Sequence, residues 1–152
     1  MSLEEIAGQV RALTDRAAIL DVVIAYATAL DARDWEALAG LFTDDARWEY
    51  RASGEQVHGS RAIAARIGPA LEHLDATQHL NGNHVITVHG DEAEHTCYYH
   101  AQHVRRGQPD GELFLGAGRY EDRLRRTPGG WRLTDRVLIS VWSEGNPAVL
   151  RR

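Results

Sequence analysis

The sequence predicts an α+β fold in which N-terminal helices pack on one face of a strongly curved antiparallel or mixed sheet. Helical periodicity dominates the first third of the chain, and long extended segments separated by turn sequences dominate the second half. Strands that curl around helices leave a cavity between the layers, which is a usual place for a ligand. No repeat or linker interrupts the 152 residues, which suffice for one substantial core, so we expect a single domain over residues 1–152.

Three helices are expected before residue 45. The apolar residues of the first recur at helical spacing: Leu3, Ile6, Val10 and Leu13. Asp15 can cap a second, longer helix over about 16–30. Asp34 can cap a short third helix over 35–42, because a carboxylate there can accept the free backbone N–H groups of the first turn.

The pattern changes from helical to extended after residue 45. Short strands are expected over 46–52 and 55–59, and Ser60 begins another helix over 61–74, which the Gly68–Pro69 pair should bend or interrupt. Turn sequences then separate four longer predicted strands, which cover residues 83–90, 93–106, 112–126 and 131–142.

Composition and charge exclude several classes of protein. A net charge of −5 with interspersed signs argues against a nucleic-acid surface, and no apolar run is long enough to cross a bilayer. Residues 1–16 lack the basic start and apolar stretch of a signal peptide, so a cytoplasmic location is expected. Cys97 is the only cysteine, which excludes an intrachain disulfide and fits a reducing compartment.

Asp31 and His79 are candidates for acid and base chemistry. A histidine exchanges its proton near neutral pH, and an aspartate on its far nitrogen would fix the tautomer and stabilise the imidazolium. His79 lies just before the predicted strand 83–90, and Tyr26 lies on the apolar helix that Asp31 ends. The residues alone leave open that Asp31 is a loop acid beside Arg33 and that His79 bonds only turn backbone. Tyr26 and Asp31 are about 140° apart around an ideal helix, so they share a site only if the helix end unwinds or the site wraps around it.

Alternation along the predicted strands selects further candidates. In the strand 93–106 the more apolar face carries Ala93, His95, Cys97, Tyr99, Ala101 and His103. His103 is therefore favoured over His100 as a cavity residue. In the last strand the apolar face carries Trp131, Leu133, Val137, Ile139 and Val141, with Asp135 as a polar exception that is either paired or functional. Trp48 and Tyr50 are more typical of a core but could line the cavity.

Metal and cofactor sites are not expected. The histidine spacings 79/84, 84/89, 95/100 and 100/103 are all odd, so regular strands place these neighbours on opposite faces. The glycine-containing segments 59–61 and 116–119 lack the strand-loop-helix context of a phosphate cradle.

The combined pattern resembles the SnoaL-like family of the nuclear transport factor 2 (NTF2-like) fold. The resemblance runs from about residue 15 to 146 and is carried by four segments in this order: YATALDARDWEALAGLFTDDARWEY, HGSRAI, TQHLNGNHVITVHGDEAEHTCYYHA and GRYEDRLRRTPGGWRLTDRVLISVW. The branch that it resembles includes scytalone dehydratase, bile acid 7α-dehydratase and hexachlorocyclohexane dehydrochlorinase. It implies a cone of helices around a strongly curved sheet.

The resemblance also implies cofactor-independent elimination chemistry. Asp31 and His79 match the aspartate and histidine that remove a proton in that branch, Tyr26 matches a polar position of the same helix, and His103 is near a second histidine. The dehydrochlorinase carries an arginine in its last strand that has no matching residue in this sequence, where Asp135 and Arg136 are the nearby residues. Dehydrochlorination is therefore not favoured, and dehydration, isomerisation and cyclisation stay open.

We therefore expect a dehydratase-type lyase, or a related isomerase or cyclase, that acts on a small apolar cyclic substrate. The expected catalytic residues are His79, Asp31, Tyr26 and His103, and the expected substrate-binding residues are Trp48, Tyr50, Tyr99 and Asp135. The alternatives are a noncatalytic binding or assembly module and an epoxide hydrolase, because fold does not imply function. A homo-oligomer, dimer or trimer, is also expected.

Overall fold

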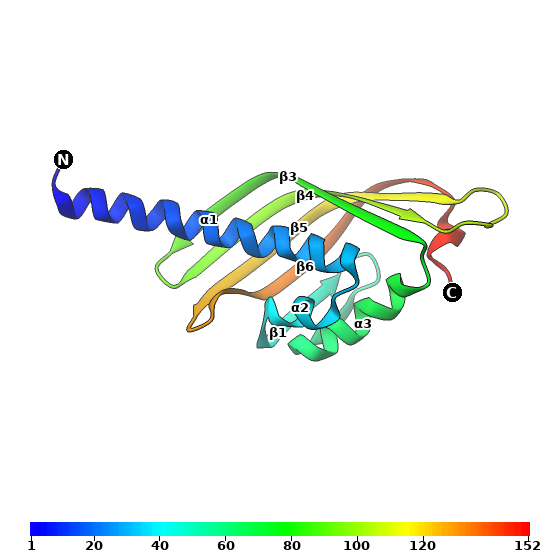
Figure 1. Cartoon of the computed structure of the whole chain (residues 1–152), viewed down its shortest axis with the longest axis horizontal. Helices are drawn as coiled ribbons and strands as arrows, with labels where there is room; N and C mark the ends of the chain where they lie inside the picture. The colour runs from blue at the N-terminus through cyan, green and yellow to red at the C-terminus, as the bar shows by residue number, and fades with distance from the viewer.

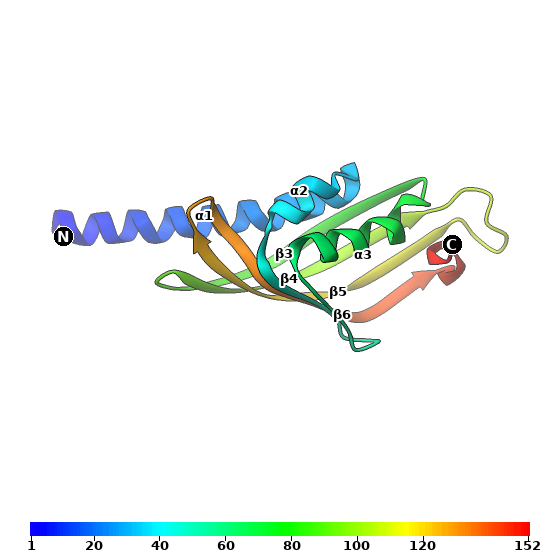
Figure 2. The same cartoon turned by 90° about the horizontal axis from the view of Figure 1, so that it is seen from below.

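The computed structural model describes residues 1–152, and its three helices cover one face of a six-stranded, curled sheet (Figures 1 and 2). The predicted α+β fold is confirmed. The helices are α1 (Leu3–Ala32), α2 (Trp35–Gly40) and α3 (Ser60–Glu72), and a short 3-10 helix covers Pro147–Leu150. The strands are β1 (Phe42–Tyr50), β2 (Glu55–His58), β3 (Ala76–His89), β4 (Glu92–Val104), β5 (Leu113–Thr127) and β6 (Gly130–Gly145).

The sheet has the order β2-β1-β6-β5-β4-β3, and only β1 and β6 run parallel. The four long strands form the expected antiparallel meander: tight turns join β3 to β4 and β5 to β6, and a loop over 105–112 joins β4 to β5. The buried core lies between the concave face of the sheet and the helices, and Figure 2 shows this arrangement of helices and sheet from below. The sheet remains open, so its concave face keeps room beside the helices. No helix is both long and apolar enough to span a membrane.

The prediction of two helices before residue 31 is wrong, because α1 runs unbroken from Leu3 to Ala32. Ser2 caps it, accepting a hydrogen bond from the Glu5 N–H at 3.1 Å while the Glu5 carboxylate accepts from the Ser2 N–H at 2.7 Å. Asp15 lies inside the helix and accepts two hydrogen bonds from the Arg126 guanidinium. A tertiary partner therefore engages the carboxylate that the local pattern assigned to a cap.

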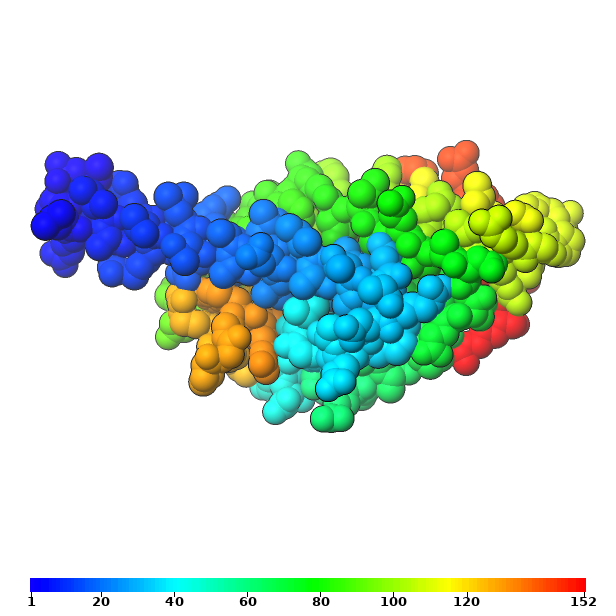
Figure 3. Space-filling view, viewed as in Figure 1, coloured from blue at the N-terminus to red at the C-terminus, as the bar shows by residue number.

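The first half of α1 projects beyond the sheet as an arm, which is evident in the space-filling view (Figure 3). All four apolar residues of its predicted stripe are exposed: Leu3, Ile6, Val10 and Leu13. The helical pattern was correctly predicted, but within one chain these side chains have no core to enter.

The remaining helices largely follow their local signals. Asp34 caps α2 by accepting a hydrogen bond from the Ala37 N–H at 2.9 Å, as expected. The helix ends at Gly40, however, and Phe42 already opens β1. Pro69 does not interrupt α3, which continues to Glu72.

Departures from regular alternation in β3 and β6 matter for the site. β3 begins at Ala76 and continues through the expected Asn81–Gly82 turn, with a bulge between Gly82 and Val85 where Asn83 has φ of 55°. His79 therefore lies within β3, whereas the sequence placed it before the strand. In β6 an extra residue at Thr134 reverses the alternation, so that Arg136, Leu138 and Ser140 take inward positions, and a second extra residue at Val141 shifts the register again.

Candidate active site

A cavity of about 520 Å³ lies between α1, α3 and the concave face of the sheet. Its walls are mostly apolar and aromatic, which suits a small hydrophobic ligand. Polar groups reach it from strands β3, β4 and β6: His79, His103 and Ser140. Four of the predicted aromatic residues also line it: Tyr26, Trp48, Tyr50 and Tyr99.

Asp31 holds His79 through both side chain and backbone. The imidazole Nδ1 of His79 lies 2.7 Å from Asp31 Oδ1, and the His79 backbone N–H donates to Asp31 Oδ2 at 2.9 Å. The Thr77 hydroxyl donates a third hydrogen bond to Asp31 Oδ1 at 3.0 Å. With Nδ1 occupied by the carboxylate, Nε2 is the ring nitrogen of His79 left for the cavity.

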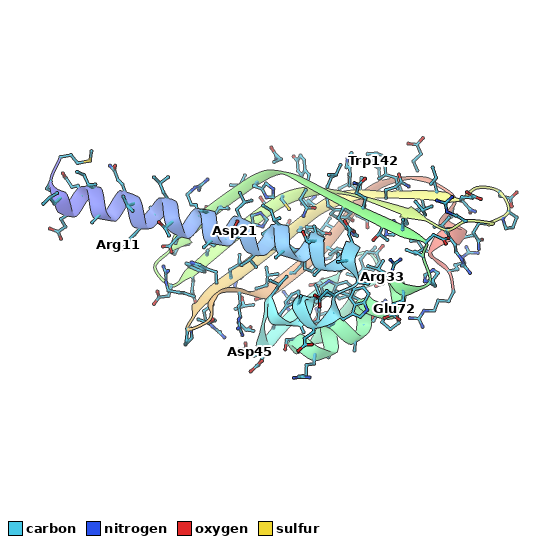
Figure 4. All side chains as sticks on the ribbon, viewed as in Figure 1. Arg11, Asp21, Arg33, Asp45, Glu72 and Trp142 are labelled. Atoms are coloured by element: carbon cyan, nitrogen blue, oxygen red, sulfur yellow. The ribbon has the colours of Figure 1, made fainter.

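The end of α1 places Asp31 behind His79 and outside the cavity lining. Arg33 takes a left-handed conformation with φ of 56° just after the helix, and its guanidinium donates to the carbonyl oxygens of Leu71 and Leu74. Figure 4 shows Arg33 and Glu72 near one another, where α1 and α3 both end. The hydrogen bonds from Arg33 to the carbonyl oxygens of Leu71 and Leu74 fix the end of α1, which carries Asp31.

The charge of Asp31 is stabilised despite its place at the negative end of a helix dipole. Partial burial raises the pKa of its carboxyl, but the hydrogen bonds from His79 and Thr77 outweigh burial, and the pKa is lowered overall. A carboxylate in contact with one imidazole nitrogen is the arrangement by which hydrolytic triads orient a base.

His103 lies beside His79 but in a different electrostatic state. The two rings are edge to face with centroids 6.1 Å apart, and His103 Nδ1 lies 3.2 Å from the carbonyl oxygen of Phe114. Burial and the nearby His79 lower the pKa of His103 to about 4. His103 is thus neutral near pH 7, with Nδ1–H as donor to the carbonyl and Nε2 as an acceptor. His100, the other candidate, is exposed against Trp142 on the outer face.

Three hydroxyl groups gather on β1, β4 and β6. The Ser140 hydroxyl lies 3.4 Å from that of Tyr50 and 3.5 Å from that of Tyr99. Burial raises the pKa of the Tyr99 hydroxyl, so it keeps its proton and can donate it in a hydrogen bond. The sequence interpretation missed Ser140 because regular alternation placed Ile139 inward, and the bulge at Thr134 reversed that assignment.

Tyr26 reaches the deep wall of the cavity and covers a buried cation. The Arg136 guanidinium lies 4.0 Å from the ring centroids of both Tyr26 and Tyr120, and it donates two hydrogen bonds of 2.8 Å to Asp122. Burial raises the pKa of Tyr26, so its hydroxyl is protonated. Tyr26 and Asp31 therefore serve different parts of the site without any unwinding of α1.

Asp135 lies away from the cavity. Its carboxylate pairs with Arg47, whose Nε is 2.9 Å from Asp135 Oδ1, and neither residue is in the cavity lining. The assignment of Asp135 to the inward face was wrong, because the extra residue at Thr134 turns its side chain outward and turns Arg136 inward. The sequence left open whether Asp135 is paired or functional, and the ion pair with Arg47 supports the first alternative.

Comparison with known proteins gives a consistent picture. A family model described as a SnoaL-like domain matches residues 11–137. The uncharacterized protein Rv2910c of Mycobacterium tuberculosis is 32% identical over 125 residues, which are 82% of this chain and 84% of that protein. Terrestric acid biosynthesis cluster protein E of Penicillium crustosum is 27% identical over 91% of this chain and 90% of its own length.

Solved structures share the fold. An NTF2-like protein with a cystatin-like fold from Novosphingobium aromaticivorans has a TM-score of 0.77 at 29% identity, covering 97% of this chain and 94% of that one. A scytalone dehydratase-like protein of the same organism has a TM-score of 0.80 at 24% identity, with 89% of each chain covered. LinA, a hexachlorocyclohexane dehydrochlorinase, has a TM-score of 0.78 at 20% identity, covering 91% and 94%. The NTF2-like architecture is thereby confirmed.

Proposed function

The chain belongs to the family of SnoaL-like domains, and from this premise we propose that it is a cofactor-independent lyase of the dehydratase type, or a closely related isomerase or cyclase. The substrate class is a small, apolar, cyclic molecule with an acidic C–H bond. The names of several similar proteins, which include a dehydratase, a dehydrochlorinase and a biosynthesis cluster protein, support an elimination or biosynthetic role.

The observation that carries the proposal is the Asp31–His79 pair at the wall of an apolar cavity. His79 has one nitrogen 2.7 Å from the aspartate, its side chain is only 6% exposed, and it lines a cavity of a volume suited to one small ligand. A base screened from bulk water and oriented by a carboxylate is suited to proton abstraction from carbon.

In the proposed dehydration, His79 Nε2 takes the proton from the substrate C–H bond. The electron pair of that bond forms the new C=C bond while the bond to the leaving hydroxyl breaks. Asp31 stabilises the imidazolium that forms, because its carboxylate contacts the Nδ1–H. The leaving hydroxyl receives one proton from a neighbouring hydroxyl donor and departs as water. The proton held by His79 then replaces the proton that this donor gave up.

The neighbouring polar groups divide the remaining tasks. Tyr50, Tyr99 and Ser140 supply hydroxyl donors for a substrate carbonyl or for the leaving group. Neutral His103 presents Nε2 as an acceptor for a substrate hydroxyl, and the protonated Tyr26 can donate from the deep wall. Trp48 adds aromatic surface. Acid and base groups of this kind each contribute roughly 10²- to 10⁴-fold, with positioning and electrostatics supplying the rest.

The test is turnover of a panel of hydroxylated polycyclic ketones by the wild-type chain and by His79→Gln and Asp31→Asn variants. We expect His79→Gln to lose activity by at least about 10²-fold with the fold intact, since glutamine cannot accept and return a proton near pH 7. His100→Gln is the matched control, because His100 is exposed on the outer face. Activity within a few-fold of wild type in His79→Gln would overturn the assignment.

The alternatives have separate outcomes in the same experiment. A noncatalytic binding module would bind members of the panel, detected by quenching of tryptophan fluorescence, and turn over none. Epoxide hydrolysis by paired carboxylates has less support, because no carboxylate is among the residues that line the cavity.

We further propose that the chain forms a homo-oligomer, either a dimer or a trimer, in the cytoplasm. The exposed apolar stripe of the α1 arm supports assembly, since such residues gain free energy when a partner covers them. A single unpaired cysteine is compatible with a reducing compartment. Light scattering of the wild type and of Ile6→Glu would test the assembly, which requires a smaller species in the variant.

A further inference from the structure

A second histidine pair lies outside the cavity lining, where β3 meets β4. His84 Nδ1 is 3.0 Å from His95 Nε2, and the two rings are stacked with centroids 5.3 Å apart. The Cys97 thiol completes the group, with its Sγ and the two ring nitrogens all within 4.8 Å of one another. The proposed reaction uses none of these three side chains.

The β3 bulge brings this group together. Gly82 pairs with Tyr98 and Val85 pairs with Thr96, so two residues of β3, Asn83 and His84, stand opposite the single Cys97. The extra residue turns the His84 side chain to the inward face, which already carries His95 and Cys97 at alternate positions of β4. Odd spacing along one strand had excluded a two-histidine site, but the pair forms across strands and over a bulge.

The surroundings of His95 match the outer shell of a metal-binding histidine. His95 Nδ1 lies 2.7 Å from Asp122 Oδ2, and Arg136 holds the same carboxylate with two hydrogen bonds. The carboxylate of Asp122 accepts the Nδ1–H and thereby leaves the Nε2 lone pair pointed at His84 and Cys97. Carboxylate contact to the far nitrogen is the common device that orients a metal-ligating imidazole.

We propose that His84, His95 and Cys97 form a binding site for a borderline divalent transition-metal cation, with Zn²⁺ as the best match. Imidazole nitrogen and thiolate sulfur are both zinc ligands, and three protein ligands with solvent in the fourth position are typical of an open zinc site. Tetrahedral Zn²⁺ places such atoms about 3.3 to 3.6 Å apart, given Zn–N and Zn–S distances of about 2.0 and 2.3 Å. The three ligand atoms here lie within 4.8 Å of one another, so side-chain rotations that move them by about 1 Å would bring them to these distances.

Binding requires a defined proton balance. The Cys97 thiol loses its proton to solvent and binds as thiolate, while His84 moves its proton from Nδ1 to Nε2 and binds through Nδ1. One proton is released per ion. His84 is only half-buried and lies on β3, which is the edge strand of the sheet, so the cation can enter there and keep solvent as its fourth ligand. The ion would tie β3 to β4 across the bulge.

The test uses the untagged chain after dialysis against a chelator, titrated with Zn²⁺ in competition with a chromophoric chelator. We expect one ion per chain, and a loss of affinity of at least about 100-fold in Cys97→Ser and in His84→Gln. The control is His100→Gln, which removes an exposed histidine of the same strand and should bind as wild type does. Co²⁺ in place of Zn²⁺ should give a thiolate-to-cobalt charge-transfer band in the wild type, absent in Cys97→Ser.

Thermal unfolding supplies a readout that is independent of enzymatic activity. Zn²⁺ should raise the Tm of the wild type and of His100→Gln but not that of His84→Gln, because a ligand stabilises only the state that binds it. Because His84 is only half-buried, His84→Gln should fold and report on Zn²⁺ binding even if a change at buried Cys97 prevents folding. Equal Zn²⁺ affinity in wild type and His84→Gln, or a cobalt complex without the thiolate band, would overturn the proposal.

Discussion

Replacing His103 with glutamine should flatten the pH dependence of stability between pH 7 and pH 4. Burial, with a smaller effect of His79, lowers the pKa of His103 from 6.5 to about 4. The unfolded chain takes up this proton near pH 6.5, whereas the folded chain remains neutral at that nitrogen until about pH 4. Because the unfolded state binds more protons across this interval, stability is fully present above about pH 6.5 and falls as the pH falls.

The magnitude follows from the separation of the two pKa values. A difference of about 2.5 pKa units corresponds to about 3 kcal/mol when the pH has dropped below 4, and to about 2 kcal/mol between pH 7 and pH 5. Glutamine at position 103 keeps an N–H donor for the Phe114 carbonyl oxygen but has no proton to gain. The variant should therefore lack this part of the slope.

Urea unfolding at pH 7, 6, 5 and 4, followed by tryptophan fluorescence, measures the effect as a change in midpoint at constant m. Subtracting the two profiles cancels the contributions of Asp31 and other titrating groups that both chains share. His100→Gln is the control, and its profile should retain the wild-type slope. If His103→Gln and wild type lose the same stability between pH 7 and pH 5, the neutral, buried state assigned to His103 is wrong.

Two further substitutions test the packing that shapes the cavity. Gly118→Ala should destabilise the chain by about 1 to 3 kcal/mol, because its Cβ would meet the Ile139 carbonyl oxygen at 2.0 Å; the control Gly82→Ala, with nothing within 4 Å, should stay within about 0.5 kcal/mol by urea unfolding. Arg136→Met should cost about 3 to 5 kcal/mol, because the buried Asp122 carboxylate loses its arginine and keeps only the hydrogen bond from His95. Adding Asp122→Asn should restore part of that loss, and a double variant no more stable than Arg136→Met would contradict the reasoning.

The success of the strand interpretation depended on regularity. In β4 every residue from Glu92 to Val104 pairs in sequence with β5, so alternation correctly placed Tyr99 and His103 inward. In β6 the same reasoning placed Asp135 inward, and one extra residue made it wrong. Composition gives no warning of such a residue, because a bulge arises from the fit of one strand to its neighbours.

The helix-cap prediction failed at Asp15 and succeeded at Asp34 for related reasons. The period of the apolar residues predicted helix along the N-terminal segment, but Asp15 has the same chemistry whether it caps a helix or pairs with Arg126 from a distant strand. Only the folded chain brings Arg126 there. Asp34, with no such partner, behaves as its local pattern predicts.

By itself the sequence determined the α+β class, the order of helices and strands and the resemblance that singled out Asp31 and His79, because periodicity, capping and turn residues act over a few neighbours. The tertiary structure alone decided which side chains meet: Asp31 behind His79, Ser140 between two tyrosines, and His84 against His95 and Cys97. These contacts join residues up to about a hundred positions apart, and a single bulge reverses which face a side chain takes. The register and the helix ends therefore had to be known before the chemistry of the site could be assigned.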